Sequence, residues 1–219
     1  MADLVADAAG SYIAELQRGY LADRSSAVAA LAQLRRGAGK LPEQVPQLWG
    51  MTGTEQLYAD GKLSETDAER AEAAVFLAVT LYALHQQSRT GQGMHRAGVE
   101  LGAAVRRLMP AGALDEPIRR RFVRAGTAET RAALADRLRA LISLLRKVSI
   151  PLDYALLARQ LYQAQLPDGL RQVRQSWGRS FHAYRPQQSG AGSPAPRPDT
   201  TTPSGIASVD VPFADKDSS

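Results

Sequence analysis

Apolar residues recur every three or four positions along the first 185 residues of this chain, and that period constrains its fold more than any other feature. Such spacing gathers apolar side chains on one face of an α-helix, whereas a half-buried strand would need strict alternation. Ala, Leu, Arg, Glu and Gln are the commonest helix formers present. We therefore predict an all-α, two-lobed helical bundle with helices over residues 3–21, 23–37, 64–88, 97–109, 116–125, 128–147, 153–164 and 168–184.

Capping residues and glycines indicate where some of these helices begin and end. Asp23 is the expected cap of the second helix and Gly37 its stop. Ser64 should cap the long third helix, with Asp67 in the capping-box position. In the Pro- and Gly-bearing connection over 37–53, the expected packing anchors are Leu41, Val45, Leu48 and Trp49. The core of the last two helices should contain Tyr154, Tyr162, Trp177, Phe181 and Tyr184.

Two stretches lack the helical pattern. Residues 89–95, Arg-Thr-Gly-Gln-Gly-Met-His, are interpreted as a flexible break that could divide residues 1–185 into lobes over 1–90 and 97–185. From residue 186 the chain is rich in Pro, Gly, Ser and Thr and has almost nothing apolar to bury. We expect residues 186–219 to form a disordered tail.

The sequence gives little support to a catalytic, cofactor or metal site. It has no cysteine, which excludes disulfides and thiolate metal ligands, and His85, His95 and His182 lack a metal-binding spacing. Residues 91–96 lack the third glycine of a dinucleotide loop, and Gly39-Lys40 lacks the rest of a phosphate loop. We predict no catalytic residue, no cofactor, no metal and no enzymatic activity. The acidic start and the lack of a long apolar run favour a cytoplasmic protein that does not enter a membrane.

The positive charge is concentrated in the part of the chain that is expected to fold. The whole chain carries +5, but residues 1–185 hold 25 basic against 18 acidic residues and so carry about +7. Most of the cations are arginines, whose planar guanidinium suits phosphate, and we therefore expect a polyanionic partner. The alternative is that these arginines only keep the surface solvated.

Several arginines fall on helix faces that point away from the predicted core. Arg120 and Arg124 lie opposite Ile118 and Phe122, and a bound polyanion would offset their mutual repulsion. The basic residues that end the second helix could instead complement its dipole. Because aromatic residues are scarce around the arginines, contact with backbone phosphates is favoured over base stacking. The predicted nucleic-acid-binding residues are Arg35, Arg36, Lys40, Arg106, Arg107, Arg119, Arg120, Arg124, Arg139 and Arg146.

The order of several short motifs resembles that of one known family. The chain carries Leu-Arg-Arg-Gly at 34–37, Leu-Asp-Tyr at 152–154 and Val-Arg-x-x-Trp at 173–177. Between them lie the segments 98–108, 118–122 and 134–145, in the order seen in that family. Together these motifs, spread over about residues 30–185, are similar to the CasB family, the small subunit of the bacterial type I-E CRISPR surveillance complex Cascade.

That resemblance implies a helical, non-catalytic protein present as two copies in Cascade. Its partners would be a second copy of itself, the crRNA-backbone subunit and the large subunit. It would line the path of the displaced non-target single-stranded DNA and support the crRNA–target DNA heteroduplex. Two other functions remain open from the residues alone: a helical protein-interaction adaptor with an Arg-rich surface, and a small nucleic-acid enzyme.

Overall fold

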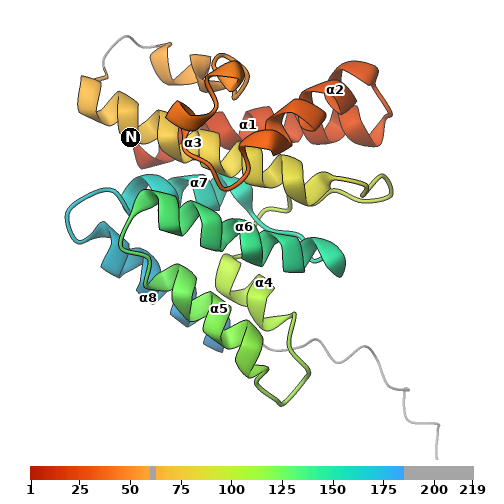
Figure 1. Cartoon of the computed structure of the whole chain (residues 1–219), viewed down its shortest axis with the longest axis vertical. Helices are drawn as coiled ribbons and strands as arrows, with labels where there is room; N and C mark the ends of the chain where they lie inside the picture. Colours follow the sequence, from red (N-terminus) through yellow and green to blue (C-terminus); the bar gives the residue numbers. More distant parts are fainter. Residues whose placement is uncertain (60–62, 185–219) are drawn as a thin grey trace, which may run out of the picture. The chain divides into compact units, whose positions relative to one another are not determined.

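The computed structural model describes residues 1–59 and 63–184, and the prediction of an all-α fold is confirmed for them (Figure 1). Four short 3-10 helices, η1–η4, occupy the connection between the second and third α-helices, at Arg35–Gly37, Pro42–Gln44, Pro46–Leu48 and Thr54–Tyr58. The α-helices of the described part are α1 Ala2–Leu21, α2 Ser25–Leu34, α3 Glu65–Gln86, α4 Leu101–Arg106, α5 Glu116–Gly126, α6 Arg131–Lys147, α7 Tyr154–Gln163 and α8 Gly169–Ala183.

Helix α3 is the central element of the fold. Every residue from Ala74 to Ala83 is buried, so this helix has no solvent-facing side in its middle turns. It packs against α1, α2, α6 and α7, while α4 packs on α8 and α5 on α6. Figure 1 shows α2 on one side of α3 and α6 on the other, while α1 crosses behind α3 and packs on α7 as well. Helices from both sides of residues 89–96 therefore share one core.

The capping prediction is confirmed at one helix and wrong at another. The Ser64 hydroxyl accepts a hydrogen bond from the Asp67 backbone N–H and so caps α3. Asp23 does not cap α2, which begins after Arg24. Asp23 instead has a φ of 52°, because the chain reverses between α1 and α2 within three residues and needs a left-handed residue there. Helix α6 also begins later than predicted, after the Thr130 cap.

The end of the segment that follows α3 is held by hydrogen bonds, so the expectation of a flexible break over 89–95 is wrong for Met94 and His95. The Met94 carbonyl accepts from the Leu152 backbone N–H, and the Arg96 N–H donates to the Leu152 carbonyl. The Gln17 side chain pairs with both backbone groups of His95. After Arg96 the chain turns at Gly98, which has a φ of 79° and donates its N–H to the Asp153 carboxylate, and α4 therefore begins at Leu101 rather than at 97. Division into lobes stays a prediction.

The predicted packing anchors have mixed outcomes. Val45 and Leu48 are buried as expected, and Leu41 is half-buried. Trp49 is not an anchor, because its side chain is 67% exposed. The four aromatics placed in the core at the end of the chain are buried, namely Tyr154, Tyr162, Trp177 and Phe181, whereas Tyr184 is half-buried just beyond α8.

Residues Met1–Pro186 form one compact unit and Gln187–Ser219 are assigned to another. The tail predicted over 186–219 lies outside the described residues. Within the described part, none of the helices is both long and apolar enough to cross a membrane.

Candidate nucleic-acid interface

Helix α5 presents a cationic face to solvent because Ile118, Phe122 and Ala125 pack on the other side, although Val123 is also exposed. Phe122 stacks on Phe181 of α8 with ring centroids 5.3 Å apart, and Ile118 packs on the same core. This contact turns Arg120 and Arg124 outward, where both are exposed. Among residues 1–59 and 63–184, neither guanidinium has an ion-pair or hydrogen-bond partner. Their charge is therefore available to an external anion.

Arg119 on the same helix is partly neutralised. Its Nη1 lies 3.1 Å from the Glu116 carboxylate one turn earlier, and both side chains are about half exposed. Arg137 of α6 donates to the Arg124 backbone carbonyl at 2.6 Å and fixes α5 against α6. Sequence reasoning missed Arg137, because this role depends on a contact between two helices rather than on a pattern within one.

A close approach between α6 and the turn that follows η1 joins two groups of predicted residues. The Gly39 backbone, with a φ of 80°, is covered by the aliphatic part of Arg139, and a Cβ at Gly39 would come within 2.6 Å of the Arg139 Cδ. This contact places Arg139 next to Lys40. Both are exposed, as are Arg35 and Arg36 in η1. We call the surface formed by Arg35, Arg36, Lys40 and Arg139 the η1–α6 cationic patch.

The remaining predicted cations are separate from this patch or engaged elsewhere. Arg106 is half-buried on α4 and donates to the Pro110 carbonyl at 3.1 Å, while Arg107 is exposed beside it. Arg146 donates to the Gln87 side chain at 2.6 Å. Arg89 donates to the Arg146 carbonyl at the end of α6, so it serves as a helix cap. No hydrogen bond or ion pair within the described chain links Arg106 or Arg107 to the η1–α6 cationic patch.

Two of the three histidines, His85 and His95, form hydrogen bonds with Tyr154 that support the fold. His85 is fully buried, its Nδ1 lies 2.8 Å from the Tyr154 hydroxyl, and burial lowers its pKa to about 3. His95 accepts from the Tyr154 backbone N–H through Nδ1, and burial lowers its pKa as well. His182 is exposed on α8. No group of three His, Asp or Glu side chains that could hold a metal is found within the described residues.

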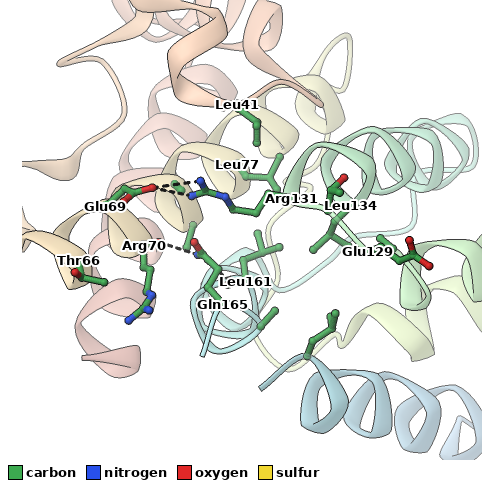
Figure 2. A pocket seen from close by; sticks show the side chains of 16 residues that line it. Leu41, Thr66, Glu69, Arg70, Leu77, Glu129, Arg131, Leu134, Leu161 and Gln165 are labelled. Carbon is green, nitrogen blue, oxygen red and sulfur yellow. Dashed lines mark hydrogen bonds and ion pairs between the residues drawn. The ribbon is translucent and has the colours of Figure 1, made fainter. Parts of the chain in front are cut away.

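A cavity of about 390 Å³ opens between α3, α6, α7 and the start of α8 (Figure 2). Its walls include Leu77, Leu134 and Leu161, and the Arg131–Glu69 ion pair, at 3.2 Å, spans its rim. This pair occupies the carboxylate of Glu69, and the nearby Thr130 hydroxyl is used as the α6 cap. The cavity therefore has an apolar floor, and no hydrogen bond among the described residues pairs a hydroxyl that lines it with a histidine or a carboxylate that lines it.

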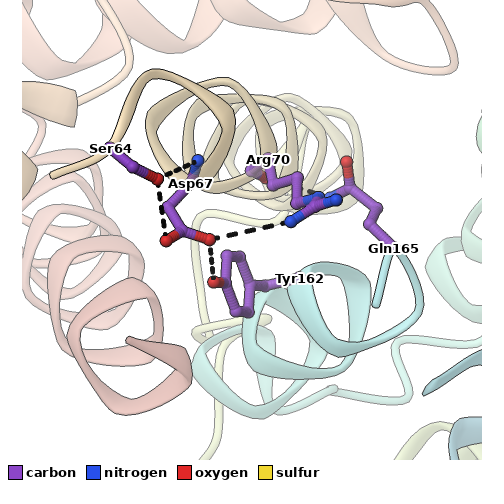
Figure 3. A network of polar contacts seen from close by, with 5 residues as sticks. All are labelled: Ser64, Asp67, Arg70, Tyr162 and Gln165. Atoms are coloured by element: carbon purple, nitrogen blue, oxygen red, sulfur yellow. Dashed lines mark hydrogen bonds and ion pairs between the residues drawn. The ribbon is translucent and has the colours of Figure 1, made fainter. Parts of the chain in front are cut away.

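A polar network beside this cavity fixes α3 against α7 (Figure 3). The Tyr162 hydroxyl donates to the Asp67 carboxylate at 3.0 Å, and Gln165 donates to the Arg70 carbonyl at 2.9 Å. The Ser64 hydroxyl also donates to Asp67, and these two hydrogen bonds hold the pKa of Asp67 below its usual value. The network has a structural explanation, since each of its members links two helices or caps one.

The helical fold and the exposed cations of α5 and of the η1–α6 cationic patch together define the class of protein. It is an all-helical protein whose main exposed polar feature is a set of arginines and one lysine without ion-pair partners among the described residues. The family model described as CRISPR-associated protein Cse2 matches residues 30–182. The chain belongs to this family, and its resemblance to CasB is confirmed.

Solved structures agree with this assignment. The crystal structure of CasB from Thermobifida fusca is 51% identical to the chain, with a TM-score of 0.75, and the match covers 82% of this chain and 98% of that one. A chain of a CRISPR RNA-guided surveillance complex is 19% identical, with a TM-score of 0.56, over 81% of this chain and 95% of that one. The second likeness is one of fold alone. Comparison with curated protein sequences finds no match.

Proposed function

We propose that the chain is a non-catalytic subunit of a type I-E Cascade complex that binds nucleic-acid backbone. It holds the displaced non-target strand and supports the crRNA–target heteroduplex, and it assembles with the crRNA-backbone subunit, the large subunit and a second copy of itself. The observation that carries this proposal is that Arg120, Arg124 and the η1–α6 cationic patch are exposed and have no ion-pair partner among the described residues. Family membership and the likeness to CasB support it.

The mechanism requires only a small free energy from these contacts. Formation of an R-loop exchanges one duplex for another of similar stability, so a few phosphate contacts to the displaced strand can decide whether it persists. Arginines on rigid helices suit this task, because their guanidinium groups bind phosphate without reading sequence. The guide then determines the target, and the small subunit stabilises whichever strand is displaced.

The test is a salt series on the assembled complex. Arg120→Glu with Arg124→Glu should lower retention of a matched target duplex, and each lost contact to a single strand should reduce the slope of log affinity against log salt by roughly 0.7. The double variant should therefore lose about 1.4 from the slope for each copy of the subunit whose two arginines contact the strand. Arg36→Glu with Lys40→Glu should behave alike. Circular dichroism checks the fold, since exposed substitutions change stability within about ±0.5 kcal/mol.

The matched control reverses two exposed arginines elsewhere. Arg18 on α1 and Arg171 on α8 are exposed, and Arg18→Glu with Arg171→Glu changes the net charge by the same amount. If this control weakens binding as much as the α5 variant, the effect comes from net charge and not from a defined surface. If assembled α5 and η1 variants keep the wild-type affinity and slope, the arginines do not bind DNA, and the adaptor function for acidic proteins is favoured instead.

A further inference from the structure

Trp49 is held in a defined position although most of its side chain faces solvent. The indole is 67% exposed, while Val45 and Leu48 just before it are each 1% exposed. Its Nε1–H donates to the Pro42 carbonyl at 3.3 Å, which orients the ring against the η2 turn. A tryptophan gains much free energy from burial, so a fixed and exposed one is a candidate contact residue.

A cavity of about 230 Å³ lies next to the indole. Trp49 and Pro42 line one side and Phe76 of α3 lines another, so that apolar surface continues from the exposed ring into the cavity. Glu72 also lines it, and its carboxylate accepts a hydrogen bond from the Tyr58 hydroxyl. The site thus offers a flat aromatic face with a small recess beside it.

The η1–α6 cationic patch begins close to this ring. Pro42, whose carbonyl holds the indole, is two residues from Lys40, and the neighbouring Gly39 is the residue that Arg139 covers. Glu72 lines the cavity beside the indole, and its charge disfavours a phosphate directly over the ring. A single-stranded nucleic acid fits this arrangement of charges, because its phosphates can lie on Lys40 and Arg139 while an uncharged base lies on the ring.

We propose that Trp49 is a stacking platform for one unpaired base of the strand whose phosphates the η1–α6 cationic patch binds. This inference rests on the proposed function, and adds to it a contact with the base. Stacking on an aromatic side chain does not distinguish one base from another, since every base has a π-face. It therefore fits a subunit that must accept a displaced strand of any sequence. A protein partner on Trp49 is the competing occupant.

The two tryptophans of the chain make the contact directly measurable. Trp177 is 2% exposed and donates to Gln160, so quenching of fluorescence by a bound base reports on Trp49. We expect that titrating the full chain with single-stranded oligodeoxythymidylate quenches the emission. Trp49→Phe should abolish the quenching but keep the affinity, whereas Trp49→Leu should weaken binding by about tenfold, on the order of one stacked base. An abasic oligonucleotide of equal length should bind without quenching.

The salt slope separates this inference from the proposed function. Trp49→Leu should leave the slope unchanged, because it removes no phosphate contact, whereas Arg36→Glu with Lys40→Glu should reduce it. The stacking platform is overturned if wild-type protein binds with a normal salt slope but without quenching, and if Trp49→Leu binds with the wild-type affinity. The proposed phosphate contacts would then still stand. Loss of complex assembly by Trp49→Leu with unchanged DNA binding overturns it in favour of a protein partner. Absence of any salt-dependent binding refutes both proposals.

Discussion

Tyr154 is the residue on which the buried polar groups of the fold converge. Its hydroxyl lies 2.8 Å from His85 Nδ1, and its backbone N–H donates to His95 Nδ1. The ring meets Tyr82 edge to face, with centroids 5.5 Å apart. The His85 ring is fully buried, so protonating it would place a positive charge in the core. This cost is the reason that the pKa of His85 falls to about 3.

The buried histidine predicts a dependence of stability on pH. In the unfolded chain a histidine titrates near 6.5, so between about pH 6.5 and 3 the unfolded state binds a proton that the folded state does not. The free energy of unfolding should therefore fall as the pH is lowered through this window, by up to about 1.4 kcal/mol per pH unit for one group. His85→Gln should remove this part of the slope, as measured by urea unfolding at pH 7 and pH 5.

The difference in pH dependence between wild type and His85→Gln isolates His85, because the carboxylates and His95 titrate in both proteins. Asp67, whose pKa is also lowered, adds to the loss of stability at acid pH in each protein alike. The matched control is His182→Gln, which removes an exposed histidine from α8 and should leave the wild-type slope in place. Equal slopes for wild type and His85→Gln would mean that the folded state accepts the proton at its ordinary pKa.

At the scale of elements, α4 and α8 approach each other at a glycine. A Cβ at Gly102 would lie 2.0 Å from the Trp177 carbonyl oxygen and 2.6 Å from the Phe181 backbone nitrogen. Backbone atoms cannot move aside as the end of a side chain can, so the absence of a side chain at Gly102 fixes the distance between the two helices. Phe181 then reaches Phe122, and α5 acquires the orientation that exposes its arginines.

Two glycine substitutions should therefore have opposite effects. Gly102→Ala should destabilise the fold by about 1–3 kcal/mol or more, because the added methyl separates α4 from α8. Gly178→Ala, in α8 itself, meets nothing within 4 Å and should stabilise by about 0.5–1 kcal/mol through helix propensity. Thermal unfolding followed by circular dichroism measures both. A neutral Gly102→Ala would show that the two helices are not in close contact.

The sequence predicts features that depend on the spacing of residues within one helix, and it misses features that depend on contact between two elements. The Ser64 cap and the outward position of Arg120 and Arg124 follow from local spacing, and the structure agrees with that geometry. The contact of Arg139 with Gly39 joins residues a hundred positions apart, and no local pattern encodes it. The prediction that Trp49 is a packing anchor is wrong for the same reason, since apolar character does not say whether another element covers the ring.

For the whole molecule, the amino- and carboxy-terminal helices contribute to a common core. Helix α1 packs on α7, and the Tyr162–Asp67 and Gln165–Arg70 hydrogen bonds join α3 to α7. The Arg159–Asp3 ion pair joins α7 to α1 as well. Elements from both halves are needed to bury α3, so we expect the described residues to unfold as one cooperative unit.

Removing residues 186–219 should leave this unit intact. The buried hydrophobic residues of the described part run from Val5 to Phe181, and the segment beyond 186 has few apolar side chains with which to extend that core. Truncation should therefore keep the helical signal and shift Tm by no more than about 2 °C, the change that corresponds to about 0.5 kcal/mol in a chain of this size.

The removed segment carries two basic and four acidic residues, so the truncated protein gains about two positive charges relative to the full chain. Its affinity for a single strand should stay equal or rise at low salt, with the arginine contacts unchanged. A fall in Tm of many degrees would instead make the segment part of the folded core, and a lower salt slope on truncation would assign it phosphate contacts of its own.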